Sequence, residues 1–187
     1  MDIDLLSGIM LALLFSALFS GLEIAIVSSN LLQIEVKSMK GKQGVSWLAD
    51  KLKQPVYLVG TMLFGNTIAL VVYGELMSKW LTPWFSQYIN GSVILLLIIT
   101  VISTLVVLIF AEFLPKVVFR RKPNRILNQF KFILMGLYSI LIIPTRGLLS
   151  ISNFILTKIL RLDLEDKNIS LGRVDLTDYI TKMSSSV

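Results

Sequence analysis

Residues 92–116 have the sequence SVILLLIITVISTLVVLIFAEFLPK, and this stretch decides the fold class. No charged residue precedes Glu112 in it, and Ile, Val and Leu dominate. A helix needs about 20 mostly apolar residues to cross a bilayer. Residues 5–28 and 56–77 form two further stretches of that kind. We therefore expect an all-α integral membrane protein with three transmembrane helices.

Composition supports this class and excludes others. Of 187 residues, 55% are hydrophobic and 16% charged, whereas soluble domains average about 25% charged residues. The chain contains no Cys and no His, which excludes disulfides, thiol catalysis, the usual zinc sites and a histidine general base. We expect no enzymatic activity. The net charge of +6 lies between the apolar runs, so it does not predict nucleic-acid binding.

The distribution of basic residues predicts the orientation in the cell membrane. Residues 30–54 and 116–131 are the basic segments between and after the spans, and basic loops face the cytoplasm. The N-terminus is then expected outside, with the aromatic residues Trp80, Trp84, Phe85 and Tyr88 in the outer interface. The N-terminus has no basic segment before the first span, so that span is not expected to be a cleaved signal peptide. A short amphipathic helix is expected around residues 46–53.

Residues 132–160 allow two interpretations. The apolar runs 132–143 and 148–160 are separated by Pro144, Thr145, Arg146 and Gly147. Basic residues at both ends favour a juxtamembrane or re-entrant helix pair on the cytoplasmic side. A fourth span would instead bury Arg146 near its centre. Residues 161–187 are acidic and polar, and we expect them to be a cytoplasmic stub that leads to a further region.

Polar side chains within the spans are the candidate site. A carboxylate at membrane depth costs about 2.5–3.5 kcal/mol on insertion scales, which makes Glu23 and Glu112 notable. Ser16, Ser20 and Glu23 share one face of the first span, at i, i+4 and i+7. The two serines also fit a small-residue packing interface whose hydroxyls bond to carbonyls of their own helix.

The second and third spans add further oxygen ligands. Asn66 lies roughly 15 Å from the cytoplasmic end, and Gly60 and Gly65 would let a neighbouring helix approach. Pro115 removes the helical partner of the Ala111 carbonyl, beside Glu112. The alternatives are an interhelical hydrogen bond for Asn66 and a kinked helix end with Glu112 paired to Lys116.

By depth, Ser16, Ser20, Asn66 and Glu112 are expected to line one cavity. Its mostly neutral oxygens suit hard cations, and composition alone does not choose between Mg²⁺ and Na⁺. Glu75, near the outer end of the second span, is expected to be a solvated helix-end residue.

Three motifs resemble the membrane domain of the CNNM/CorC family over about residues 5–160. They are FSGLEIA at 19–25, GNT at 65–67 and EFLPK at 112–116. The resemblance implies a homodimeric Mg²⁺ transporter whose efflux is coupled to Na⁺ entry. It implies a Mg²⁺ site made by Ser16, Ser20, Asn66 and Glu112, with Glu23 as support. Residues 1–160 would be the transmembrane domain, and 161–187 would lead to absent CBS domains that bind nucleotide.

A second resemblance allows an alternative function. SLGRVD at residues 170–175 is similar to a bacterial branch of the family associated with gliding motility. The chain would then be a structural membrane module that supports a motility or secretion complex without transport.

Overall fold

The computed structural model describes residues 3–39, 44–89 and 91–159, and this part of the chain is helical, without strands. The predicted all-α class is therefore confirmed. The elements in chain order are α1 (Ile3–Val27), α2 (Leu31–Met39), α3 (Val45–Leu52), α4 (Pro55–Phe85), α5 (Ser92–Val106), η1 (Val107–Phe113), α6 (Leu114–Arg120), α7 (Pro123–Phe154) and η2 (Ile155–Ile159), of which η1 and η2 are π-helical.

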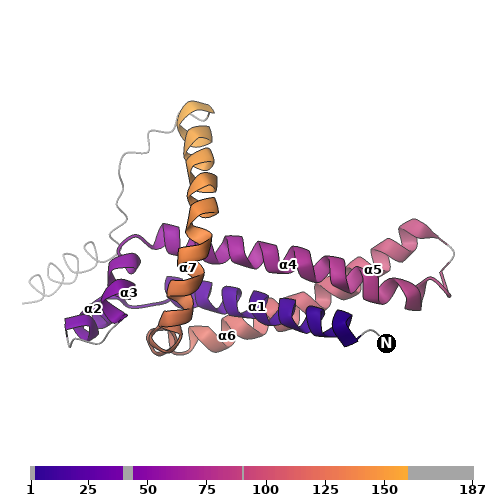
Figure 1. The fold of residues 1–187 in the computed structure, drawn as a ribbon, viewed down its shortest axis with the longest axis horizontal. Coiled ribbons are helices and arrows are strands. Elements are labelled where there is room, and N and C mark those ends of the chain that lie inside the picture. Colours follow the sequence, from indigo (N-terminus) through magenta and orange to yellow (C-terminus); the bar gives the residue numbers. More distant parts are fainter. Residues whose placement is uncertain (1–2, 40–43, 90, 160–187) are drawn as a thin grey trace, which may run out of the picture.

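The molecule is built on three long helical rods that lie side by side (Figure 1). α1 packs against α4, and on another side against η1 and α6, which continue directly from α5. Segments long and apolar enough to cross a membrane are Ile3–Val27, Pro55–Phe85, Ser92–Arg120 and Pro123–Lys158. The chain is thus a multi-pass membrane protein.

The interior is divided into two apolar clusters. The first joins the second half of α1 to α2, α3, the start of α4 and α7, and includes Leu22, Leu48, Leu58 and Leu134. The second joins the first half of α1 to the later part of α4 and to α5, and includes Ile9, Tyr73 and Ile99. The two clusters follow each other along α1 and α4, so the middle of these helices lies between them.

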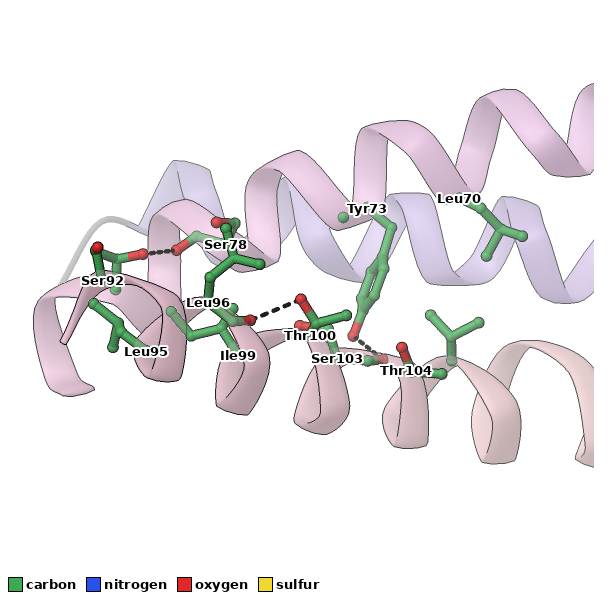
Figure 2. A pocket seen from close by; sticks show the side chains of 13 residues that line it. Leu70, Tyr73, Ser78, Ser92, Leu95, Leu96, Ile99, Thr100, Ser103 and Thr104 are labelled. Carbon is green, nitrogen blue, oxygen red and sulfur yellow. Dashed lines mark hydrogen bonds between the residues drawn. The ribbon is translucent and has the colours of Figure 1, made fainter. Parts of the chain in front are cut away.

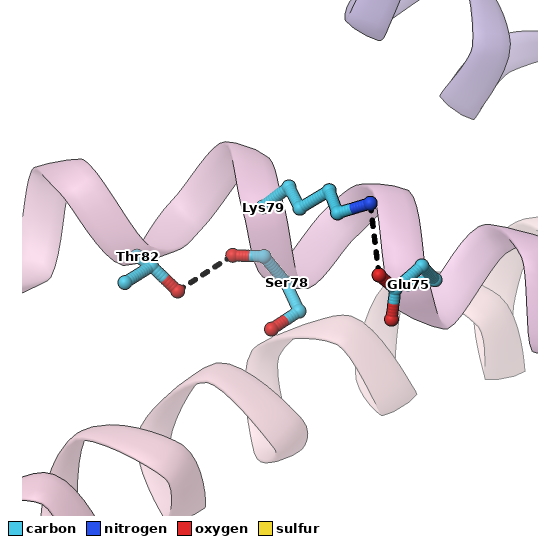
Figure 3. A network of polar contacts seen from close by, with 4 residues as sticks. All are labelled: Glu75, Ser78, Lys79 and Thr82. Carbon is cyan, nitrogen blue, oxygen red and sulfur yellow. Dashed lines mark hydrogen bonds and ion pairs between the residues drawn. The ribbon is translucent and has the colours of Figure 1, made fainter.

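α4 begins as predicted and extends further than predicted. Pro55 occupies the first turn, where the missing N–H costs nothing. The helix runs to Phe85 and contains Pro83, so the aromatic residues expected in an outer loop lie mostly on its last turns. Glu75 and Lys79 form an exposed i,i+4 ion pair of 2.9 Å beside Ser78 and Thr82 (Figure 3). Glu75 is therefore exposed on the surface of α4.

The predicted break at residues 144–147 is wrong, because α7 continues through Pro144. An internal proline costs a helix about 3 kcal/mol. Burial of side chains before and after Pro144 offsets this cost, because Tyr138, Ile142 and Thr145 all face the interior. The Thr145 hydroxyl also donates to the Leu141 carbonyl at 2.7 Å. α7 is a single helix that runs across α1 and α4 instead of along them (Figure 1).

The connection between α1 and α4 contains α3, close to the predicted position, and α2, which was not predicted. Hydrogen bonds tie the beginning of α2 to the beginning of α7. The Asn124 side-chain oxygen accepts from the Asn30 amide at 2.9 Å, and its side-chain nitrogen donates to Gln33 at 2.7 Å. Lys53 pairs with Glu35 of α2 at 3.5 Å. Short polar contacts thus hold α2, α3 and α7 together at one end of the molecule.

Candidate functional site

A polar layer lies between the two apolar clusters, and a contact between α1 and α4 defines it. The Ser16 hydroxyl donates to the Asn66 side-chain oxygen at 2.7 Å. Both residues are buried, Ser16 completely and Asn66 with 8% exposure. Ala12 and Ala69, one turn away on the two helices, belong to the buried apolar surface. The structure therefore brings together two of the predicted site residues from different spans.

Ser20 lies one helical turn from Ser16 and is fully buried. Its hydroxyl has no hydrogen-bond partner among the described residues. Thr61, Thr67 and Thr145, by contrast, donate to carbonyls of their own helices at 2.6–2.9 Å. Buried polar groups are normally paired, so the Ser20 hydroxyl is available to a ligand.

A close contact between the Phe19 ring of α1 and the backbone of α4 at Gly65 packs the two helices together at this layer. The Phe19 ring lies where a Cβ on Gly65 would be, so only glycine fits that position of α4. Phe19 is itself 6% exposed and precedes Ser20 directly. The glycines at 60 and 65 were expected to allow close approach, and both do, since Gly60 faces Thr145 of α7. The role of Phe19 was not predicted, because an apolar run contains no signal that distinguishes one phenylalanine from its apolar neighbours.

η1 interrupts the regular helix immediately before Pro115. The Leu114 amide donates to the Ile109 carbonyl, five residues earlier, as in a π-helix. Pro115 has no N–H, so the Ala111 carbonyl loses its α-helical donor. Ala111 and Pro115 are both buried. The predicted irregularity thus occurs at the predicted place, as a widened turn that contains Glu112.

Glu23 and Glu112 form a second polar group. Glu23 lies three residues after Ser20 on α1, and Glu112 belongs to η1. Both are half-buried, and the charges of Lys116 and Glu112 act on Glu23. Neither glutamate forms an ion pair within 4.0 Å in the described part of the chain. The Glu112–Lys116 pair, which was the alternative interpretation, is therefore not formed. Among the described residues, no hydrogen bond joins Glu112 to Ser16 or Asn66.

The acidic residues alone do not form a metal centre. Within residues 3–39, 44–89 and 91–159, no three His, Cys, Asp or Glu side chains cluster closely enough to hold a metal ion. A cation in the polar layer would have to rely on hydroxyl, amide and backbone oxygens. Hard cations accept such ligands, and Mg²⁺ commonly keeps several waters in addition.

Comparison with protein families found a match over residues 8–186 to the cyclin M transmembrane N-terminal domain, CNNM. The chain belongs to the CNNM family. This family of membrane proteins is linked to divalent-cation transport. The match includes most of residues 161–187, which lie outside the described residues. A comparison with curated proteins found no significant match.

The CNNM domain has a further cavity that sequence reasoning did not identify. It lies between α4 and α5, has a volume of about 460 Å³ and is rich in hydroxyl groups, including those of Ser78, Thr100, Ser103 and Thr104. The Tyr73 hydroxyl reaches across it and donates to the Ser103 carbonyl at 3.2 Å (Figure 2). The Ser103 hydroxyl is buried without a partner in the described structure. The spacing of Thr100, Ser103 and Thr104 places them on one helical face, a signal that could have indicated this cavity.

Proposed function

We propose that this CNNM domain transports Mg²⁺ across the cell membrane, with the polar layer as the ion site and Na⁺ entry as the driving force. One observation carries the proposal. Ser16, Ser20 and Asn66 are buried between two apolar clusters, Ser16 donates to Asn66, and the Ser20 hydroxyl has no partner among the described residues. Polar groups at membrane depth are expensive and commonly mark ion pathways.

The ligands differ in their roles. Ser16, Ser20 and Asn66 would supply neutral oxygens, which hold a hydrated cation weakly enough for release. Glu112 and the Ala111 carbonyl would contribute from η1 when α1 and η1 move closer together. Glu23, which feels the charges of both Glu112 and Lys116, would adjust the field at the entrance. Alternating access would then open the layer first toward one side and then toward the other.

The cavity between α4 and α5 suggests the second half of that path. Leu70 and Tyr73 line it, and they lie about one and two turns beyond Asn66 on α4. Movement of Tyr73 away from the Ser103 carbonyl would connect the cavity to the polar layer. The hydroxyl groups there could replace part of the ion's hydration shell.

For the membrane arrangement, we infer that α1, α4 and the α5–α6 rod cross the bilayer, with the N-terminus outside. α7 would lie along the cytoplasmic surface, since it runs across the other helices (Figure 1). The exposed apolar residues on the rods would face lipid and a second copy in a homodimer. The absence of Cys and His from the chain favours a transporter over an enzyme.

Calorimetric Mg²⁺ titration of the purified protein, in low and high Na⁺, tests the proposal. We expect saturable binding that Na⁺ weakens and that Asn66→Ala and Ser20→Ala reduce by tenfold or more. Thr67→Val is the matched control, because the exposed Thr67 hydroxyl bonds to its own helix beside Asn66. Equal Mg²⁺ binding in all variants, or none in the folded wild type, would reject the transport site.

The rival function is a structural module that supports a motility or secretion complex. In that case the Ser16–Asn66 bond only joins two helices and contributes about 0.6 kcal/mol, as is typical in membranes. Asn66→Ala would then lower the free energy of unfolding, while a Mg²⁺ titration of the wild type would show no saturable heat. The same pair of measurements therefore separates the two functions.

A further inference from the structure

A second polar cavity lies at the end of the molecule where α3, the start of α4 and α7 meet. Its volume is about 670 Å³. We call it the basic pocket, and its charged and hydrogen-bonding lining includes Lys51, Lys53, Tyr57, Tyr138, Arg146 and Asn153. It is separate from the polar layer, because none of its lining residues belongs to that layer.

The charges in the basic pocket suit an anion. Three cations line it, against one carboxylate, that of Asp50. Asp50 is 71% exposed and lies 3.8 Å from Lys51, so solvent weakens this pair. Arg146 forms no ion pair within 4.0 Å among the described residues. Its guanidinium is therefore free in this part of the structure to receive an anionic group.

Part of the pocket is held in place before any ligand arrives. The Lys51 ammonium lies 5.7 Å from the centre of the Tyr138 ring. That ring packs edge-on against Trp47, with the ring centres 5.6 Å apart. Lys53 contacts the Glu35 carboxylate at 3.5 Å, but its side chain is 56% exposed, so this pair restrains it only weakly. A preorganised set of cations loses less entropy on binding than flexible surface lysines do.

The surroundings of the pocket are apolar and face outward. On α7, Ile143 and Ile140 precede Arg146 by about one and two turns and are 76% and 72% exposed. Val56, beside the pocket residue Tyr57, is 59% exposed. In a membrane protein such residues contact acyl chains. With α7 along the cytoplasmic membrane surface, as proposed above, the basic pocket would lie at the border between lipid and water, where phospholipid headgroups are found.

We propose that the basic pocket binds the phosphate group of an anionic phospholipid, with its acyl chains along the exposed apolar residues of α7. Arginine binds phosphate through two parallel N–H donors. Lys51, Lys53 and the hydroxyl and amide groups would contact the other oxygens. Basic pockets between helices at the membrane surface bind anionic headgroups in this way. The site does not depend on ion transport.

Native mass spectrometry of the whole chain in detergent tests this proposal by titration with phosphatidylglycerol and phosphatidylcholine of identical acyl chains. We expect preferential binding of phosphatidylglycerol. Arg146→Gln should weaken it by about tenfold, because a charge-assisted bidentate contact is lost. Arg146→Lys, which keeps the charge but not the fork, should have an intermediate affinity. Arg146 is exposed, so both variants should fold, as thermal unfolding without added lipid will verify.

Lys79→Gln is the matched control, since Lys79 is an exposed lysine on the distant part of α4. It should bind phosphatidylglycerol as the wild type does. Equal binding of the two lipids, or equal affinity in Arg146→Gln and Lys79→Gln, would overturn the proposal. Inorganic phosphate supplies the same chemistry without acyl chains. If it stabilises the protein as strongly as phosphatidylglycerol, and only when Arg146 is present, the ligand is a soluble phosphate and the lipid assignment fails.

Discussion

Gly65→Ala is expected to destabilise the protein through a single added methyl group. The new Cβ would overlap the Phe19 ring, with Cδ1 at 2.8 Å, whereas ordinary contacts lie at 3.4–4 Å. Phe19 is buried in the first apolar cluster, so its ring has little room to move. Overpacking of this kind costs about 1–3 kcal/mol. α1 and α4 must therefore separate at the polar layer.

Gly74→Ala provides the control on the same helix. Nothing lies within 4 Å of a Cβ at that position. Replacing an unconstrained helical glycine with alanine stabilises by about 0.5–1 kcal/mol. Because both variants gain this helix propensity, they should differ by the overpacking cost of about 1–3 kcal/mol in free energy of unfolding. Titration with denaturing detergent, followed by far-ultraviolet circular dichroism, measures this difference.

Phe19→Leu is expected to suppress the effect of Gly65→Ala. Phe19→Leu removes the ring atoms that Gly65→Ala would meet, so the double variant should be more stable than the sum of the two single changes indicates. Because Phe19 lies between Ser16 and Ser20, Gly65→Ala should also weaken Mg²⁺ binding. If Gly65→Ala and Gly74→Ala have the same stability, α1 and α4 do not approach closely at Gly65 and the geometry of the polar layer is refuted.

Four further variants test other parts of the molecule. Asn124→Ala removes two hydrogen bonds to the beginning of α2. The local free energy of opening should fall by about 1–2 kcal/mol, so the Asn30 amide should exchange with deuterium faster. Unchanged exchange would contradict the contact. Pro115→Ala restores an N–H near the Ala111 carbonyl and should add about 1 kcal/mol of stability while calorimetry shows weaker Mg²⁺ binding. Ser103→Ala removes a buried hydroxyl without a partner and should leave thermal stability equal or higher, whereas Tyr73→Phe should lower it by about 1 kcal/mol.

The spans and the polar layer could be predicted because their signals are local. Apolar length determines a membrane helix, and depth along two antiparallel helices places Ser16 opposite Asn66. Gly65 indicated a close approach, and Pro115 indicated an irregular turn. These inferences need only helix geometry, and the contact of 2.7 Å between Ser16 and Asn66 agrees with them.

The course of α7 could not be predicted in the same way. Proline propensity indicated a break at Pro144, but the outcome depends on burial of Tyr138, Ile142 and Thr145 against other helices. Such tertiary packing has no signal within residues 132–160 themselves. The basic pocket was missed for the same reason, because Lys51 and Arg146 are far apart in sequence and meet only when α7 crosses the start of α4.

The hydrogen bonding of the hydroxyl groups favours a ligand site over a packing contact in the polar layer. The hydroxyls of Thr61, Thr67 and Thr100 donate to carbonyls of their own helices. Ser16 instead donates across to Asn66, and Ser20 has no partner in the described structure. In η1, the Ala111 carbonyl also lacks its α-helical donor. A buried hydroxyl without a partner, such as that of Ser20, costs about 1–3 kcal/mol, which an interface selected only to join helices would avoid. A cation that visits the layer would explain why that cost persists, and Mg²⁺ binding that disappears with Ser20→Ala while the fold remains would demonstrate it.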